Sequence, residues 1–147
     1  MKKRLAAMAG LYLTIALPGG ISAAPVSACS ESPVIREQPP GDPHADAFGY
    51  GPWHISADRK IWVGTKFQAG EAGNKVIWIR PAGTKLLIKG RRVDAAGAPL
   101  RVEIPAEYPW SFQVTGLYFP SAGCWEVTAR AGQSELSFMT EVSPGRR

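Results

Sequence analysis

The strongest constraint on the fold of this chain is a period of two in the hydrophobicity of its C-terminal region. Between Cys124 and Val142, side chains alternate in character on both sides of a Gly-Gln turn. Such alternation predicts a β-hairpin with one apolar face that is buried and one polar face that is exposed to solvent. A hairpin cannot bury its apolar face alone, so these residues predict a larger antiparallel sheet or sandwich. The positions that share the apolar side are Trp125, Val127, Ala129, Leu136, Phe138, Thr140 and Val142.

Shorter β-type segments precede this hairpin, each bounded by Gly, Pro, Asn or Asp. No window shows a helical period. This content predicts an all-β protein, an antiparallel β-sandwich of about seven strands in one domain over residues 53–143. The segments are residues 53–55, 60–63, 75–79, 85–89, 100–104 and 112–119.

The first 28 residues have the pattern of an export signal. A basic start at residues 2–4 precedes an apolar run at residues 5–17, which Pro18 ends before a stretch of small residues. The apolar run is 13 residues long, whereas a membrane-spanning helix needs about 20. We therefore predict a signal peptide over residues 1–28 and an extracytoplasmic location, in the periplasm, in the cell envelope or secreted.

Residues 29–52 are rich in proline. Proline removes a backbone donor, which excludes a long helix or a central strand from this segment. We predict an extended arm that lies against the sandwich or leads away from a membrane. The prolines are Pro33, Pro39, Pro40, Pro43 and Pro52.

Cys29 has two competing roles. Residues 26–29 resemble the lipobox of bacterial lipoproteins, which makes Cys29 a lipidation candidate and an acyl chain the protein's one membrane contact. Alternatively, Cys29 forms a disulfide with Cys124, the only other cysteine of an exported chain. Cys124 falls on the polar side of its strand with Glu126, so its partner would lie over the outer surface, as the arm could. Lipidation of Cys29 would leave Cys124 as a free thiol.

Charge and motifs argue against several functions. Without residues 1–28, which hold three basic and no acidic side chains, 14 Lys and Arg remain against 12 Asp and Glu, a net charge of +2. Nucleic-acid binding needs a concentrated basic face, so we expect no nucleic-acid partner. The chain has no Gly-x-Ser-x-Gly elbow and no phosphate-binding loop, so we expect no catalysis and no cofactor.

His44 and His54 are candidate metal ligands, with Asp42 and Asp46 nearby. Two histidines and a carboxylate can bind zinc or copper. The two histidines lack the fixed short spacing of a helix or strand site. A periplasmic metal-binding protein that uses His44 and His54 is therefore the alternative function.

Four aromatic residues lie beside prolines in expected loops and are candidate ligand-binding residues: Tyr50, Trp53, Tyr108 and Trp110. Flat rings held on rigid loops suit a sugar ring or a protein partner. The alternative is that these rings only cover the ends of the sandwich.

Residues 117–128, in which a turn containing Pro120 and Gly123 precedes Trp125, Val127 and Thr128, resemble the penultimate strand of bacterial immunoglobulin-like domains. Within this block, the run Gly123-Cys124-Trp125-Glu126-Val127-Thr128 is similar to a nearly identical run in a group of uncharacterised bacterial exported proteins. The resemblance implies an immunoglobulin-like sandwich and export, and it implies no activity. We expect a non-catalytic envelope protein that acts as a binding or structural accessory, with a protein or a cell-wall glycan as its partner.

Overall fold

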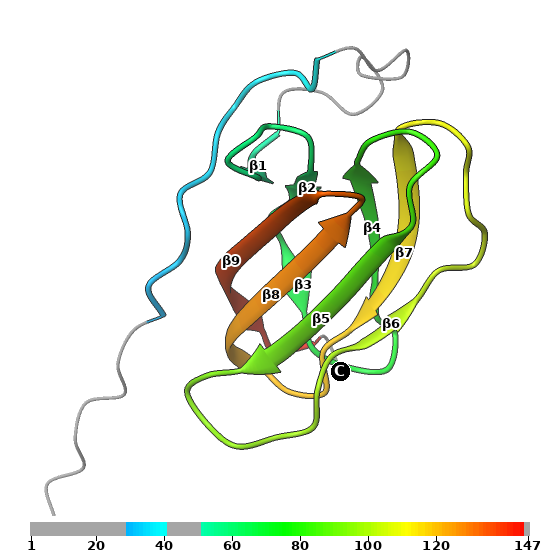
Figure 1. Cartoon of the computed structure of the whole chain (residues 1–147). Helices are drawn as coiled ribbons and strands as arrows, with labels where there is room; N and C mark the ends of the chain where they lie inside the picture. The colour runs from blue at the N-terminus through cyan, green and yellow to red at the C-terminus, as the bar shows by residue number, and fades with distance from the viewer. Residues whose placement is uncertain (1–28, 41–50, 146–147) are drawn as a thin grey trace, which may run out of the picture.

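The computed structural model describes residues 29–40 and 51–145, and within them the regular structure is entirely β. The predicted signal peptide, His44 and Tyr50 lie outside the described residues. No helix in the described ranges is long and apolar enough to cross a bilayer. Figure 1 shows two sheets packed face to face.

The first sheet has five antiparallel strands in the order β1-β2-β4-β7-β6. The second has four strands in the order β3-β9-β8-β5, in which β3 runs parallel to β9 and the other pairs are antiparallel. The first sheet contains β1 (Trp53–Ile55), β2 (Trp62–Gly64), β4 (Asn74–Ile79), β6 (Arg101–Glu103) and β7 (Phe112–Tyr118). The second contains β3 (Phe67–Gln68), β5 (Leu86–Arg92), β8 (Gly123–Ala131) and β9 (Ser134–Ser143).

The predicted antiparallel β-sandwich is confirmed. It has nine strands rather than about seven, because two- and three-residue segments such as β3 also pair. A run of two residues is too short to show a period, so β3 has no signal in the sequence.

The β8–β9 hairpin supplies one wall of the core. Trp125 and Phe138 are 0% and 2% exposed and face the opposite sheet, as the alternation predicts. The turn has two residues and begins at Gly132 with a φ of 61°, the backbone that favours glycine at the first position of a type II′ hairpin turn. Complete burial of a large apolar side chain contributes about 1.5–3 kcal/mol, so these two rings hold the sheets together.

The N-terminal arm closes the side of the sandwich between β9 and β1 (Figure 1). Its first residue, Cys29, forms a disulfide with Cys124, with 5.2 Å between the two Cα atoms. The Ser32 N–H then donates to the Met139 carbonyl at 2.9 Å, and the Met139 N–H donates to the Ser32 Oγ at 2.8 Å. Further on, Ile35 forms an antiparallel bridge with Trp53 of β1. The arm therefore joins the edges of both sheets.

Candidate functional site

Three aromatic side chains gather at the end of the sandwich where β4 ends and β7 begins. Tyr108 and Trp110 lie on the loop of residues 104–111 before β7, and Phe112 is the first residue of β7. The rings of Tyr108 and Trp110 lie 6.2 Å apart with an interplanar angle of 14°, and Phe112 lies 5.0 Å from Tyr108 and 6.2 Å from Trp110. We call Tyr108, Trp110 and Phe112 the aromatic cluster.

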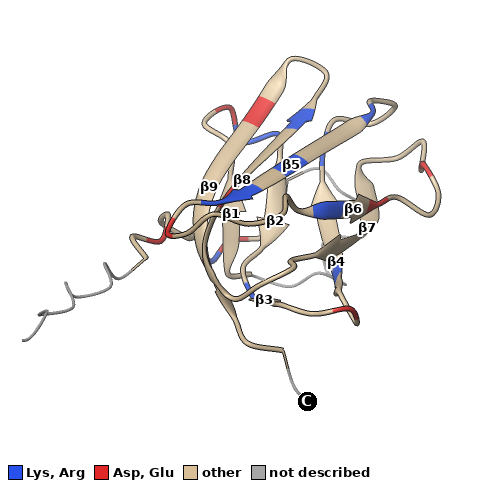
Figure 2. Ribbon diagram, turned by 90° about the horizontal axis from the view of Figure 1, so that it is seen from below, with Lys and Arg blue, Asp and Glu red and all other residues tan. Residues whose placement is uncertain are grey.

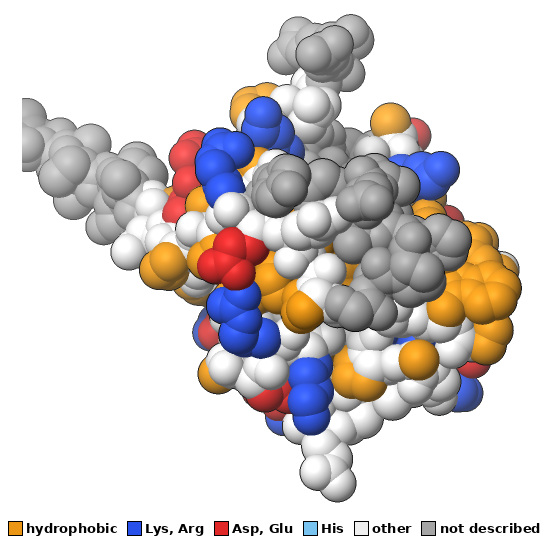
Figure 3. All heavy atoms as spheres, turned by 90° about the horizontal axis from the view of Figure 1, so that it is seen from above, with side chains coloured by type: hydrophobic (Ala, Val, Ile, Leu, Met, Phe, Trp, Pro, Cys, Tyr) orange, Lys and Arg blue, Asp and Glu red, His pale blue; other side chains and the backbone are white. Residues whose placement is uncertain are grey.

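Trp110 is the most exposed member of the aromatic cluster, at 48%. Figure 3 looks onto this end of the sandwich and shows apolar side chains gathered at its surface. Tyr108 and Phe112 are half-buried, and Phe112 packs on a second small core of Trp53, Trp62 and Ile79. The exposed ring therefore rests on a layer of packed aromatic side chains.

Arg80 holds the loop from below. It follows β4 and is only 2% exposed. Its Nη2 donates to the Tyr108 carbonyl at 2.7 Å, and its Nη1 donates to the carbonyls of Trp110 at 3.2 Å and Pro81 at 3.0 Å. A planar guanidinium offers several donors in a fixed geometry, so one buried side chain fixes two carbonyls of the cluster loop.

Gln113 is the second buried anchor of this loop, at 1% exposure. Its Nε2 donates to the Ala106 carbonyl at 2.6 Å. Its Oε1 accepts from the Tyr108 N–H at 3.2 Å and from Arg80 Nη2 at 3.1 Å. The two anchors are hydrogen-bonded to each other, so the loop has one connected polar network beneath it.

The electrostatics of Arg80 follow from its burial. Burial lowers the pKa of its guanidinium, and the nearby charge of Glu107 raises that pKa by a smaller amount. An arginine keeps its proton at any physiological pH, so carbonyl oxygens compensate this buried charge. At the rim of the loop, Lys85 and Glu107 approach to 4.0 Å with both side chains largely in solvent, where they can offer polar contacts to a ligand.

The structure separates the four candidate aromatic residues. Tyr108 and Trp110 come together, and Tyr50 lies outside the described residues. Trp53 was expected both to begin a short strand and to present its ring to a ligand; it does begin β1, but it is only 5% exposed. The strand β2 pairs with it on one side and Ile35 of the arm on the other, and its ring belongs to the small core on which Phe112 packs.

His54 is not placed as a metal ligand. It lies in β1, is 2% exposed, and stacks on Phe138 with 4.3 Å between ring centroids. Burial lowers the pKa of its imidazole, and a backbone hydrogen bond with Pro33 and the charge of Glu31 raise that pKa by less. Over residues 29–40 and 51–145, no group of three His, Cys, Asp or Glu could hold a metal ion, and His44 lies outside those ranges.

Sequence reasoning missed three residues of this site, namely Arg80, Gln113 and Phe112. Arginine and glutamine are residues that usually lie in solvent, so nothing in their identity indicates burial. A weak signal does exist, because Gln113 stands in the alternating run of β7 at a position shared with the buried Thr115.

No protein-family model matches the chain, and no curated protein matches it. A solved structure of a Bacillus anthracis protein described as a "putative lipoprotein" is similar, with a TM-score of 0.44 and 17% identity over 63% of this chain and 84% of that chain. At this identity the likeness does not extend to function.

Proposed function

We propose that this protein is a non-catalytic, exported binding module of the cell envelope, and that its aromatic cluster binds a cell-wall glycan. The observation that carries the proposal is the exposed Trp110 ring on a loop that the buried Arg80 holds in place. Exposed apolar rings alone are common on protein surfaces. Burying an arginine costs desolvation energy, and here the buried Arg80 fixes the carbonyls of Tyr108 and Trp110 and so holds the exposed ring in place before a ligand binds.

A glycan suits this surface for two reasons. A pyranose ring has a flat C–H face that packs on an aromatic ring, and aromatic side chains offer large contact area with little loss of conformational freedom. The exposed pair of Lys85 and Glu107 lies at the rim, where charged groups can form hydrogen bonds with sugar hydroxyls. The loop is fixed before the ligand arrives, which reduces the entropic cost of binding.

Export is supported by the N-terminal sequence and by the cysteines. Structural disulfides persist in oxidising compartments outside the cytoplasm, and the sulfur of Cys29 is bonded to that of Cys124. A lipid thioether would need the same sulfur atom. In this proposal the processed protein acts in the envelope through its binding surfaces and without a lipid anchor on Cys29.

The test is sedimentation of the processed protein with purified peptidoglycan, together with calorimetric titration of N-acetylglucosamine oligomers. We expect Trp110→Ala to weaken binding by about tenfold or more, as loss of an aromatic hot-spot residue does. Leu87→Ala is the matched control, because Leu87 is also an exposed apolar residue, at 63%, but lies on β5. Equal binding of the Trp110→Ala and unmodified proteins would overturn the proposal.

A further inference from the structure

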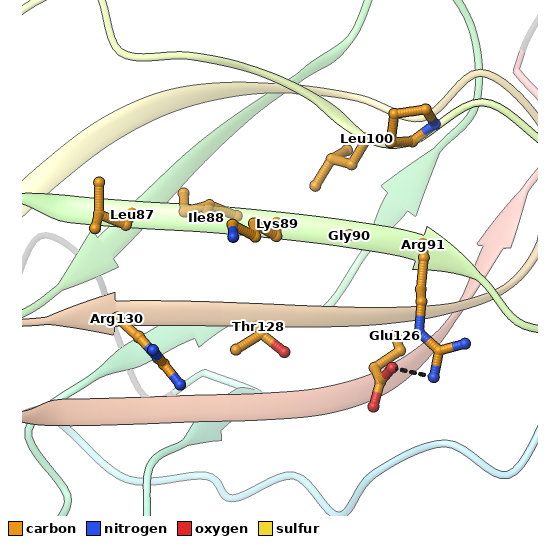
Figure 4. A pocket seen from close by; sticks show the side chains of 10 residues that line it. Leu87, Ile88, Lys89, Gly90, Arg91, Leu100, Glu126, Thr128 and Arg130 are labelled. Atoms are coloured by element: carbon orange, nitrogen blue, oxygen red, sulfur yellow. Dashed lines mark ion pairs between the residues drawn. The ribbon is translucent and has the colours of Figure 1, made fainter.

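A hollow of about 600 Å³ lies along β5, away from the aromatic cluster. Figure 4 shows its side chains: Leu87, Lys89 and Arg91 come from β5, Thr128 and Arg130 come from β8, and Leu100 lies beyond the free side of β5. The hollow thus runs over the outer face of two strands and reaches the edge of the sheet. Nothing in the proposed glycan site uses it.

The strand β5 is an edge strand, paired only with β8. The Val93 N–H donates to the Cys124 carbonyl. This bond shows which residues of β5 direct their backbone groups toward β8. In an antiparallel pair every second residue exchanges both hydrogen bonds with its partner. Arg91, Lys89 and Leu87 therefore bond to β8, and the N–H and C=O groups of Ile88 and Gly90 point away from it.

These outward backbone groups are only partly used. The Gly90 carbonyl accepts the Leu100 N–H at 3.0 Å, where the chain crosses to the other sheet. Over residues 29–40 and 51–145, neither backbone group of Ile88 has a partner. An edge with unpaired N–H and C=O groups is a template for an added strand.

The opposite edge of the same sheet is treated differently. Along β9, the arm supplies Ser32 for both backbone groups of Met139, and the Glu31 carboxylate accepts the Glu141 N–H at 2.9 Å. The short strand β3 pairs with the end of β9. The described chain thus covers one edge of this sheet and leaves a length of β5 open.

The charges along the open edge are mostly positive. Lys89, Arg91 and Arg130 line the hollow against a single acidic residue, Glu126. Arg91 pairs with Glu126 at 2.6 Å, and Arg130 pairs with Glu135 across the hairpin. Figure 2 shows basic positions along β5. Two copies of β5 placed edge to edge would bring their lysines and arginines together, so a second copy of this chain does not suit this surface.

We propose that β5 is a docking edge for an extended, acidic segment of a partner protein, which adds to the sheet as a further strand. Main-chain hydrogen bonds to the N–H and C=O groups of Ile88 would supply affinity, and alternate side chains would supply specificity. On the outer side the partner would place a carboxylate beside Lys89, the one basic residue of the hollow that forms no ion pair within the described residues. On the inner side it would place apolar side chains beside Ile88 and Leu100.

The probe for this proposal is a seven-residue peptide of alternating Val and Glu, titrated into the processed, isotopically labelled protein and followed by NMR. We expect slower hydrogen exchange of the Ile88 amide, by about tenfold at saturation. The Leu87 amide, already bonded to β8, serves as the internal control and should change little. A peptide with Lys in place of Glu should bind at least tenfold more weakly.

Charge reversal gives the decisive variant. The Lys89→Glu variant should no longer bind the Glu peptide and should bind the Lys peptide instead. The Lys75→Glu variant carries the same change on β4 of the other sheet and should bind both peptides as the unmodified protein does. A Glu peptide with N-methylated amides should not bind, because it cannot form a strand. Equal binding of both peptides, or protection that appears on a strand other than β5, would overturn the proposal. Trp110→Ala should leave this binding unchanged, so the result is independent of the glycan proposal.

Discussion

The buried guanidinium of Arg80 donates a 2.7 Å hydrogen bond to the carbonyl of Tyr108, which lies 28 residues further along the chain. This contact links the end of β4 to the loop that presents Trp110. Gln113 bonds to both residues, so a movement of the loop would break several buried hydrogen bonds at once. The rigidity of the proposed glycan surface therefore depends on one buried polar network.

Replacing Arg80 with Met should remove the hydrogen bonds that hold the loop of residues 104–111 in place. The variant keeps an apolar stem but leaves the carbonyls of Tyr108 and Trp110 without their donor, and each unsatisfied buried group costs about 1–3 kcal/mol. We expect a loss of roughly 3 kcal/mol in the free energy of unfolding, measured by urea titration. Arg101→Met is the matched control. Arg101 pairs with Glu103 on the surface, and loss of such a pair should cost less than about 1 kcal/mol.

Replacement of Trp53 by Ala should reduce the stability of the protein much more than replacement of Trp110 by Ala. Trp53 is 5% exposed, so its loss should leave a cavity and cost about 3–5 kcal/mol. Trp110 is half in solvent, and its loss should cost about 1 kcal/mol or less. Thermal unfolding measures stability, and peptidoglycan sedimentation measures binding. A large loss of stability in Trp110→Ala would show that this ring is structural.

The hairpin was predictable because its signal is local and repeated. Nine consecutive pairs join β8 to β9, and a period sustained over that length identifies the buried face. Cys124 lies on the side expected for it, away from the core, yet it is 6% exposed because the arm covers it. The alternation of residues within one strand does not indicate that a distant segment of the chain covers that strand.

The candidate site was only partly predictable, because sequence patterns indicate local structure and not contacts between distant parts of the chain. Proline beside an aromatic residue marks a rigid loop, which identified Tyr108 and Trp110. The same pattern also included Trp53, whose burial depends on pairing with β2 and Ile35 from distant parts of the chain. The anchoring of the loop by Arg80 is a long-range contact between polar residues, and sequence patterns of hydrophobicity do not contain it.

The disulfide should supply a large part of the stability. It closes a loop with a sequence separation of 95, for which the chain-entropy model gives about 4.7 kcal/mol, against about 5–15 kcal/mol for a typical domain. The variant with Ser at both Cys29 and Cys124 should therefore unfold at much lower urea concentration. Its arm should also be cut faster by protease, because the hydrogen bonds of Ser32, the packing of Ile35 and the ion pair of Glu37 with Arg59 then hold it without a covalent bond.

Intact mass of the processed protein checks the premise of that experiment. A chain that begins at Cys29 and lacks two hydrogens is expected for the disulfide. Acyl chains on Cys29 would contradict it, and so would a double Ser variant as stable as the unmodified protein. Reduction without mutation should reproduce the loss of stability and reverse on reoxidation.

Stability should fall as the pH is lowered below about 6.5, the ordinary pKa of histidine. Burial against Phe138 lowers the pKa of His54 in the folded protein. Between that lowered pKa and about 6.5, the unfolded chain binds a proton that the folded chain refuses, so acid favours unfolding. The free energy of unfolding should drop by up to about 1.4 kcal/mol per pH unit across this window.

Urea titrations at several pH values between 7.5 and 5 measure this effect, and His54→Phe is the variant that isolates it. Phe keeps the stacking on Phe138 and does not titrate, so the stability of the His54→Phe variant should vary less with pH. His44 is unchanged in this variant. Asp58 acts in a separate window. Hydrogen bonds from Ser134 and Ser56 lower the pKa of its carboxyl group, so its contribution is present above about pH 3.8 and is lost as the pH falls through the folded value. A pH dependence between 7.5 and 5 that survives in His54→Phe would assign the effect to another group.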